Sequence, residues 1–194
     1  MRYKAGYKAQ KRQELLVISG QLAKKNGFSA TGVDGFMQAA GVTSGAFYSH
    51  FSSKNDLFKA LIENELQNSI QMWQDNPHQD LTAWIDFEIE RYLSLEHVQK
   101  AEHGCILPAL ATEVAPAEDD IKSIYQQELM RGQQLFAQHL ANEAFAWGFM
   151  SQLVGAILLA RSISDLEIQK SILKSSQYFI HQALEQHQKS LPKK

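Results

Sequence analysis

Residues 31–54 constrain the fold more than any other part of the chain. Two short segments with apolar residues at helical spacing lie on either side of Gly41. A glycine at that point can take the left-handed conformation that ends a helix, and Thr43 or Ser44 can cap the next one. We expect Thr31 to cap the first helix, with Asp34 in place of the longer acid of a capping box. The stretch therefore predicts two helices joined by a tight turn.

The second of these helices is small, uncharged and polar on its outer side. Phe47 and Phe51 lie four residues apart, so both are predicted to face the core. In a helix-turn-helix the second helix enters the major groove of DNA, while the first crosses the backbone. A plain helical hairpin whose aromatic residues serve only the core is the alternative. The exposed residues favour the DNA-binding interpretation.

Each exposed residue type on this helix suits one kind of DNA contact. Ser44, Tyr48 and Ser49 can form hydrogen bonds with phosphates or base edges. Ala46 can contact a thymine methyl group, and Gly45 allows close approach. Ser52 and Ser53 are expected to cap the following helix.

Three motifs carry a resemblance to a known family: Gly27-Phe-Ser-Ala-Thr31-Gly-Val33, Ala40-Gly-Val-Thr-Ser-Gly45-Ala-Phe-Tyr48-Ser-His-Phe51 and Ser53-Lys-Asn-Asp-Leu57. Over about residues 13–62 the chain resembles the DNA-binding domain of the TetR family of bacterial transcriptional regulators. The resemblance implies that residues 43–50 supply the recognition helix and that Lys54 contacts a phosphate. Many members carry a lysine where this chain has Ser44. The predicted DNA-binding residues are Thr31, Thr43, Ser44, Gly45, Ala46, Tyr48, Ser49, His50 and Lys54.

The resemblance also implies an all-α fold with two domains. Residues 1–56 form a three-helix helix-turn-helix domain with a basic N-terminal arm, and residues 57–194 form a helical ligand-binding and dimerisation domain. The expected function is that of a cytoplasmic homodimeric regulator, most simply a repressor. It binds a pseudo-palindromic operator and is released by a small molecule, with an electrophile as one alternative. The other functions considered are a DNA-free helical interaction module and an enzyme.

The charge distribution agrees with a DNA-binding N-terminal third. Residues 1–60 contain nine Lys and Arg against three Asp and Glu, and the remainder contains ten against eighteen. A basic segment in an acidic protein is typical of one part contacting a polyanion. The predicted arm carries Arg2, Lys4, Lys8, Lys11 and Arg12, before a helix that starts at about residue 10. It either follows phosphates or is a solvated tail.

Beyond residue 53 the apolar periodicity is helical throughout. A long helix is expected up to the Asp75-Asn-Pro77 break, and a later one starts after Pro116. The large side chains of the middle helices are core residues or line an effector pocket. With the one cysteine they form the predicted ligand-binding set: Trp73, Trp84, Phe87, Tyr92, Cys105, Met130 and Trp147.

The last two helices, about 144–162 and 166–187, carry more apolar surface than a lone pair can bury. Paired across a two-fold axis they would form a four-helix interface, which is also how the resembled family dimerises. The predicted interface residues are Phe149, Leu153, Ile157, Ile172, Phe179 and Ile180. The apolar run 144–160 approaches the length of a membrane span, but polar residues at its middle favour a buried helix.

No catalytic motif, metal-ligand spacing or nucleotide loop is present, so we expect no enzyme, no metal and no cofactor. We also expect no signal peptide, and a single cysteine indicates a reducing compartment. Cys105 lies just before an apolar helix, where the helix N-terminus can stabilise a thiolate. It is either a sensor of oxidants and electrophiles or a small core residue.

Overall fold

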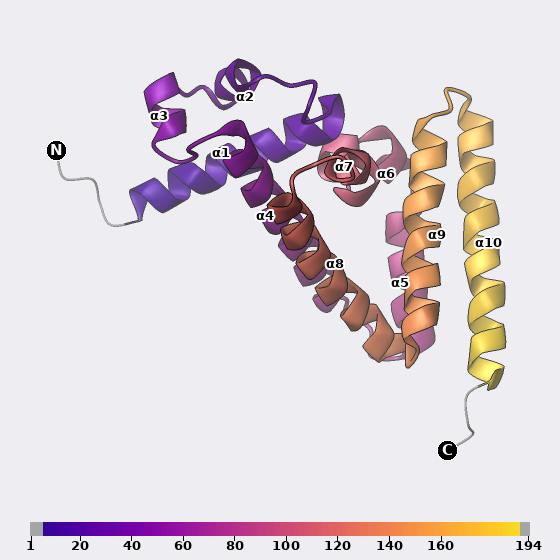
Figure 1. The fold of residues 1–194 in the computed structure, drawn as a ribbon. Helices are drawn as coiled ribbons and strands as arrows, with labels where there is room; N and C mark the ends of the chain where they lie inside the picture. The colour runs from indigo at the N-terminus through magenta and orange to yellow at the C-terminus, as the bar shows by residue number, and fades with distance from the viewer. Residues whose placement is uncertain (1–5, 191–194) are drawn as a thin grey trace. The chain divides into compact units, whose positions relative to one another are not determined.

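The computed structural model describes residues 6–190, and every regular element in that range is a helix, which confirms the predicted all-α fold (Figure 1). Besides one 3₁₀ turn, η1 (Ala101–His103), the described α-helices are α1 (Tyr7–Asn26), α2 (Val33–Ala40), α3 (Ser44–Tyr48), α4 (Lys54–Gln74), α5 (Leu81–Tyr92), α6 (Leu95–Gln99), α7 (Leu107–Val114), α8 (Asp119–Leu140), α9 (Glu143–Arg161) and α10 (Leu166–Ser190).

The chain separates into two compact units that both draw on distant parts of the sequence. The first unit comprises residues up to 71 together with 101–131, and the second comprises 72–100 together with 132–194. The predicted boundary between residues 56 and 57 separates a DNA-binding part from a ligand-binding part. The two compact units are defined by packing, so they do not test this functional division. It stays a prediction.

The turn between α2 and α3 has the predicted geometry. Gly41 has φ +62°, and its N–H donates to the carbonyls of Met37 and Gln38 at the end of α2. Thr43 Oγ1 accepts a hydrogen bond from Ala46 N–H at 3.3 Å and so caps α3. The glycine ends one helix and the threonine begins the next within three residues.

The start of α2 differs from the prediction. Gly32, not Thr31, is the N-cap residue, and no side chain caps the helix. The Thr31 hydroxyl instead donates to the Gly27 carbonyl at 2.7 Å, and the residue is buried. The competing acceptor at the end of α1 thus removes Thr31 from the capping position.

The start of α4 has the predicted serine cap. Ser53 Oγ accepts from Asp56 N–H at 3.0 Å, and Ser52 N–H donates back to the Asp56 carboxylate at 2.9 Å. This reciprocal pattern satisfies backbone donors at the helix start. The helix then ends at Gln74, directly before the predicted break.

Aromatic rings form the centre of the first unit. The Phe28 ring is stacked on Phe58 at 4.1 Å and tilted against Phe36 at 5.3 Å. Phe47 and Phe51 are fully buried with ring centroids 5.9 Å apart. Through Phe28, the loop that precedes α2 packs on both α2 and the start of α4.

In the second unit α9 and α10 lie side by side and run in opposite directions (Figure 1, orange and yellow). Among the described helices, α9 alone is long and apolar enough to cross a membrane, by length and composition only. Core helices of soluble proteins share that property. Its buried residues Ala146, Phe149, Met150, Leu153, Ala156, Ile157 and Ala160 pack inside the unit.

Candidate nucleic-acid interface

Helix α3 presents a small, polar and exposed outer face. Phe47 points inward with no exposed area, whereas Tyr48 is 53% exposed. The Tyr48 ring stands edge-on to Phe47 at 5.3 Å, which orients it at the surface. The other exposed residues of this face are Thr43, Ser44, Gly45 and Ser49.

The remaining residues of the predicted recognition helix are half-buried. Ala46 and His50 both line a groove between α1 and the α2–α3 turn. Ser49 Oγ donates to the Ala46 carbonyl at 2.7 Å, which leaves its oxygen free to accept from another donor. The hydroxyls on this face are therefore oriented by the helix itself.

Lys54 is held in one position by two contacts. Its Nζ donates to the Ser29 carbonyl at 3.2 Å and lies 4.9 Å from the centre of the Phe28 ring. A cation fixed in this way can meet a phosphate with little loss of side-chain entropy. Thr31, predicted to bind DNA, is buried and uses its hydroxyl within the turn.

The N-terminal basic residues are partly helical. Because α1 begins at Tyr7, Lys8, Lys11 and Arg12 stand on its first turns and not on an arm that precedes the helix. Arg2 and Lys4 lie outside the described residues. Lys8 and Lys11 line the groove beside the α2–α3 turn, a cavity of about 750 Å³.

Glu113 on α7 holds the loop that precedes α2. Its carboxylate accepts from Phe28 N–H at 2.8 Å, Ser29 N–H at 2.6 Å and Ser29 Oγ at 2.5 Å. Since Ser29 also binds Lys54, one acid on α7 supports the residue predicted to contact phosphate. The partners are 84 and 85 positions apart, and no local pattern in the sequence identified Glu113.

A buried ion pair joins α1 to α4 near the same segment. Lys24 Nζ lies 2.7 Å from a Glu65 carboxylate oxygen and donates to the Gly104 carbonyl at 3.1 Å. The side chains are 6% and 12% exposed. A Cβ on Gly20 would lie 2.5 Å from Glu65 Oε1, so a larger residue at this position would require the carboxylate to shift.

The predicted ligand-binding residues are divided between the two units. Cys105 and Met130 belong to the first unit, and the other five belong to the second. Trp73 and Trp84 are buried and meet Phe136 edge-on at 4.9 and 5.3 Å. Met130 and Trp147 are exposed, at 43% and 40%. In the second unit the structure therefore brings the two buried tryptophans together around Phe136.

Cys105 is buried at the start of α7. It is 6% exposed, and Leu107 N–H donates to its sulfur at 3.5 Å. Burial raises the pKa of the nearby Tyr125 to about 12, with a smaller contribution from Cys105. The thiol lies in an apolar environment and not on the surface.

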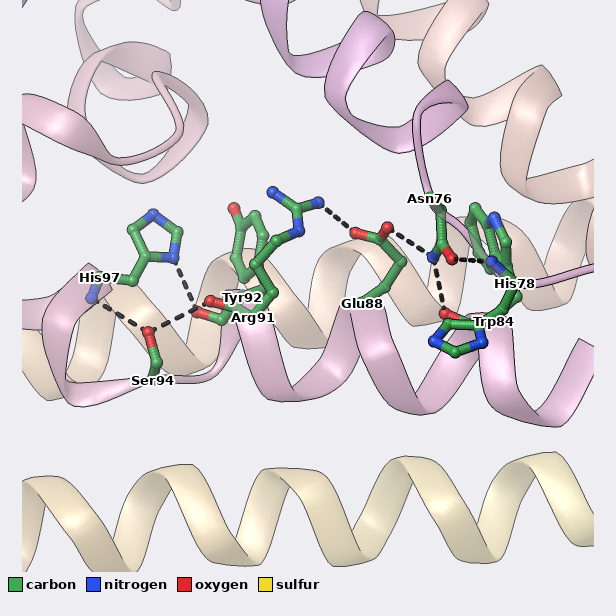
Figure 2. A network of polar contacts seen from close by, with 8 residues as sticks. All are labelled: Asn76, His78, Trp84, Glu88, Arg91, Tyr92, Ser94 and His97. Carbon is green, nitrogen blue, oxygen red and sulfur yellow. Dashed lines mark hydrogen bonds and ion pairs between the residues drawn. The ribbon is translucent and has the colours of Figure 1, made fainter.

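A strip of polar groups follows α5 in the second unit (Figure 2). Asn76 Nδ2 donates to Glu88 at 2.8 Å and to the Trp84 carbonyl at 3.0 Å, and Arg91 pairs with the other oxygen of Glu88. Glu88 is 1% exposed, and this burial raises the pKa of its carboxyl group. Farther along, His97 Nδ1 lies 2.7 Å from the Tyr92 carbonyl.

The six predicted interface residues differ in exposure. Phe149, Leu153, Ile157 and Ile180 are buried inside the protomer, and the Phe149 ring lies 5.3 Å from that of Phe136 on α8. Ile172 is half-buried, whereas Phe179 is 60% exposed. An apolar groove of about 240 Å³ lies beside Phe179, lined by Ala144, Phe145, Gly148, Phe149, Gln152, Ile180 and Ala183.

The comparisons with known proteins agree with this geometry. Residues 19–61 match the family model described as "Bacterial regulatory proteins, tetR family". That range runs from the middle of α1 to the first turns of α4 and includes all of α3. An uncharacterised HTH-type transcriptional regulator of Lactococcus lactis subsp. lactis is 24% identical over 185 residues, which cover 85% of this chain and 92% of that protein.

A second relative is known both by sequence and by structure. The HTH-type transcriptional repressor NemR of Escherichia coli K12 is 24% identical over 138 residues, or 68% of this chain and 67% of that protein. The crystal structure of the reduced form of E. coli NemR matches with a TM-score of 0.73 at 23% identity, over 86% of this chain and 95% of that one.

These relatives and the matched family are transcriptional regulators and not enzymes, as predicted. Proteins of this family are soluble and cytoplasmic, bind DNA and small-molecule effectors, and typically act as dimers. The family match, the relatives and the helix-turn-helix geometry agree: residues 19–61 of this chain are similar to the DNA-binding domain of the TetR family of bacterial helix-turn-helix transcriptional regulators.

Proposed function

We propose that the protein is a cytoplasmic, ligand-responsive repressor that binds a pseudo-palindromic operator as a homodimer. The observation that carries this proposal is the outer face of α3, which exposes Tyr48 and several hydroxyls, together with the fixed Lys54 at the start of α4. Short polar side chains and a glycine suit a helix that enters the major groove. Half-sites about 34–36 Å apart, or somewhat wider, then follow from two-fold symmetry.

The operator can be found without knowledge of the regulated genes. Genomic fragments retained by the purified protein are sequenced, and the shared sequence is tested as a labelled duplex. An inverted repeat is expected, with affinity that falls steeply with salt. Fragments without a shared sequence, or binding insensitive to salt, would contradict the proposal.

The exposed part of α9 and α10 supports the dimer. Phe179 and the neighbouring apolar groove leave an apolar face on the second unit. A second copy related by a two-fold axis would cover both at once, because each copy offers the same surface. Of the six predicted interface residues, only Phe179 and Ile172 have solvent-exposed surface that a second copy could cover.

We propose a small apolar or aromatic effector that binds among the middle helices and releases the operator. The aromatic group formed by Trp73, Trp84 and Phe136 and the neighbouring buried Glu88 support this class of ligand, since they combine apolar surface with a few polar groups. In the same unit Trp147 offers exposed apolar surface, and Phe87 and Tyr92 stand on α5, whereas Met130 belongs to the first unit.

Repression lifted by a ligand requires reciprocal coupling. If the effector prefers the DNA-free form by about 1–3 kcal/mol, operator DNA must weaken effector binding by the same factor. Calorimetric titration of the protein with an effector, in the absence and in the presence of operator, measures the two effector affinities. Equal affinities would rule out release by this ligand.

A further inference from the structure

A second basic cavity adjoins the outer face of α3 at Ser49 and shares Lys8 and His50 with the groove described above. It is formed between the first turns of α1 and the end of α3, has an open volume of about 520 Å³, and is lined by Gly6, Lys8, Ala9, Arg12, Ser49 and His50. Two of these residues are cations, and none of the described lining residues is an acid. The nearest acid on α1 along the adjoining groove, Glu14, is paired with Lys11 at 2.6 Å. The cavity therefore favours an anion.

Arg12 is positioned for such a ligand by stacking. Its guanidinium carbon lies 4.6 Å from the centre of the buried Phe51 ring. A guanidinium fixed by its flat face keeps its N–H groups at the edge, where they can bind two oxygens of one phosphate. Helix α1 also has no side-chain cap among the described residues, so its N-terminus adds a positive dipole end.

His50, which lines the same cavity, also has an unsatisfied ring nitrogen. Its Nδ1 is buried and has no hydrogen-bond partner among the described residues. Burial, followed by repulsion from Lys8 and Arg12, holds the pKa of this imidazole below its ordinary value of 6.5. The free protein thus keeps His50 neutral at neutral pH, next to two uncompensated cations.

We propose that Lys8, Arg12 and His50 bind one backbone phosphate of the operator, and that His50 takes up a proton from solvent when the phosphate binds. The phosphate brings a negative charge that offsets Lys8 and Arg12. The proton adds to the free ring nitrogen, and the phosphodiester remains a monoanion. This proposal rests on the proposed function. It adds Lys8 and Arg12 as phosphate ligands and gives the predicted DNA-binding residue His50 a proton-linked role.

The other charged groups around His50 make contacts of their own within the protein. On α1, Lys11 and Glu14 form an ion pair that raises the pKa of the lysine and lowers that of the acid. On α4, Asp56 accepts from Ser52 and Lys54 donates to Ser29. Tyr7 lines the adjoining groove. Of these groups His50 alone has an ordinary pKa between pH 5 and 8.

The sign of the pH dependence follows from linkage. The pKa of His50 is low in the free protein and is higher when the phosphate is bound, so binding takes up protons in the interval between the two values. Operator affinity therefore rises as the pH falls through that interval, by at most about tenfold per pH unit for each protomer. Above both pKa values the affinity is independent of this group.

The test combines DNA-binding titrations with NMR of the full-length protein. Affinity for a labelled operator is measured from about pH 8 to about pH 5 at constant ionic strength, for the wild type and for His50→Gln. The wild type is expected to bind more tightly at low pH, and His50→Gln is expected to lose most of that gain. An unchanged pH profile in His50→Gln would overturn the proton uptake.

Lys8→Ala and Arg12→Ala test the site itself. Each should weaken operator binding about tenfold and reduce the salt slope by roughly 2 per dimer, because one phosphate contact is lost in each protomer. Lys25→Ala, at the exposed end of the same helix, is the matched control. If all three variants bind equally well, Lys8 and Arg12 do not hold a phosphate.

NMR titration of His50 in the wild-type protein tests the proposal without requiring any variant to fold. Its pKa in the wild type is expected to rise on addition of operator. In the DNA-free protein it should rise toward the ordinary value in Lys8→Ala and Arg12→Ala. An equal rise with millimolar inorganic phosphate alone would reassign the cavity to a free anion. A wild type that binds no DNA would instead contradict the proposed function.

Discussion

At the scale of single residues, the buried carboxyl group of Glu88 is the polar group whose burial most clearly affects the stability of the fold. Glu88 is nearly inaccessible to solvent, and its carboxylate oxygens are bound by Asn76 and Arg91 in place of water (Figure 2). A buried carboxylate is tolerated only with such partners. Its burial therefore makes the stability of the fold depend on pH.

Glu88→Gln tests this dependence. Because burial raises the pKa of Glu88, the folded state holds its proton more tightly than the unfolded state does. Its contribution to stability is full below the unfolded pKa and is lost as the pH rises through the folded value. The unfolding free energy of the variant, relative to that of the wild type, should increase from about pH 4 to pH 7. Urea titrations at fixed protein concentration measure it, and a difference that is constant or falls would contradict the argument.

Cys105 is expected to react slowly while the protein is folded. Its sulfur is buried, so alkylation should be at least about tenfold slower in the native protein than in urea. Mass spectrometry over a time course gives both rates. Fast native labelling, with a loss of operator binding that Cys105→Ser prevents, would show a thiol sensor instead.

At the scale of elements, α7 supports the DNA-binding loops. Glu113 fixes the loop at residues 28 and 29, and the same loop holds Lys54. Glu113→Gln replaces charged acceptors by neutral ones, which should cost about 2 kcal/mol and weaken operator binding several-fold. Glu63→Gln, an exposed change on α4, is the control. Equal operator affinity in both variants would limit α7 to a structural role.

Local sequence signals predicted the helix-turn-helix well because the residues that begin and end its helices act on near neighbours in the sequence. Gly41, Thr43 and Ser53 act on neighbours within four residues. Gly41 and Ser53 have their predicted roles, and of the two residues predicted as alternative caps of α3, Thr43 and Ser44, Thr43 is the cap. The prediction that Thr31 caps α2 was wrong because the Thr31 hydroxyl donates its hydrogen bond to the Gly27 carbonyl, four residues earlier. Glu113 was missed because its partners are distant in sequence.

The pattern at the last two helices was ambiguous for a different reason. Apolar spacing marks buried faces but does not say which molecule buries them. Leu153 and Ile157 pack inside the protomer, whereas Phe179 is left exposed. The candidate ligand residues share this ambiguity, since Trp73 and Trp84 occupy an aromatic core.

At the scale of the whole molecule, the exposed apolar face of α9 and α10 predicts self-association. Phe179→Glu introduces a charge where the wild-type side chain is 60% exposed. The variant should remain folded by circular dichroism and sediment as a monomer at micromolar concentration, where the wild type sediments as a dimer. Lys122→Glu, on the exposed side of α8, should leave the dimer intact. A monomeric wild type would refute the assembly.

The central claim is that α3 and Lys54 bind the operator. The affinities of the wild type and of three variants for one labelled duplex test it most directly. Tyr48→Ala and Lys54→Ala should each weaken binding by about 1–3 kcal/mol, with a shallower salt slope for Lys54→Ala. Lys25→Ala should bind like the wild type, and thermal unfolding checks that all variants fold. Wild-type affinity in both Tyr48→Ala and Lys54→Ala would show that DNA binds elsewhere or not at all.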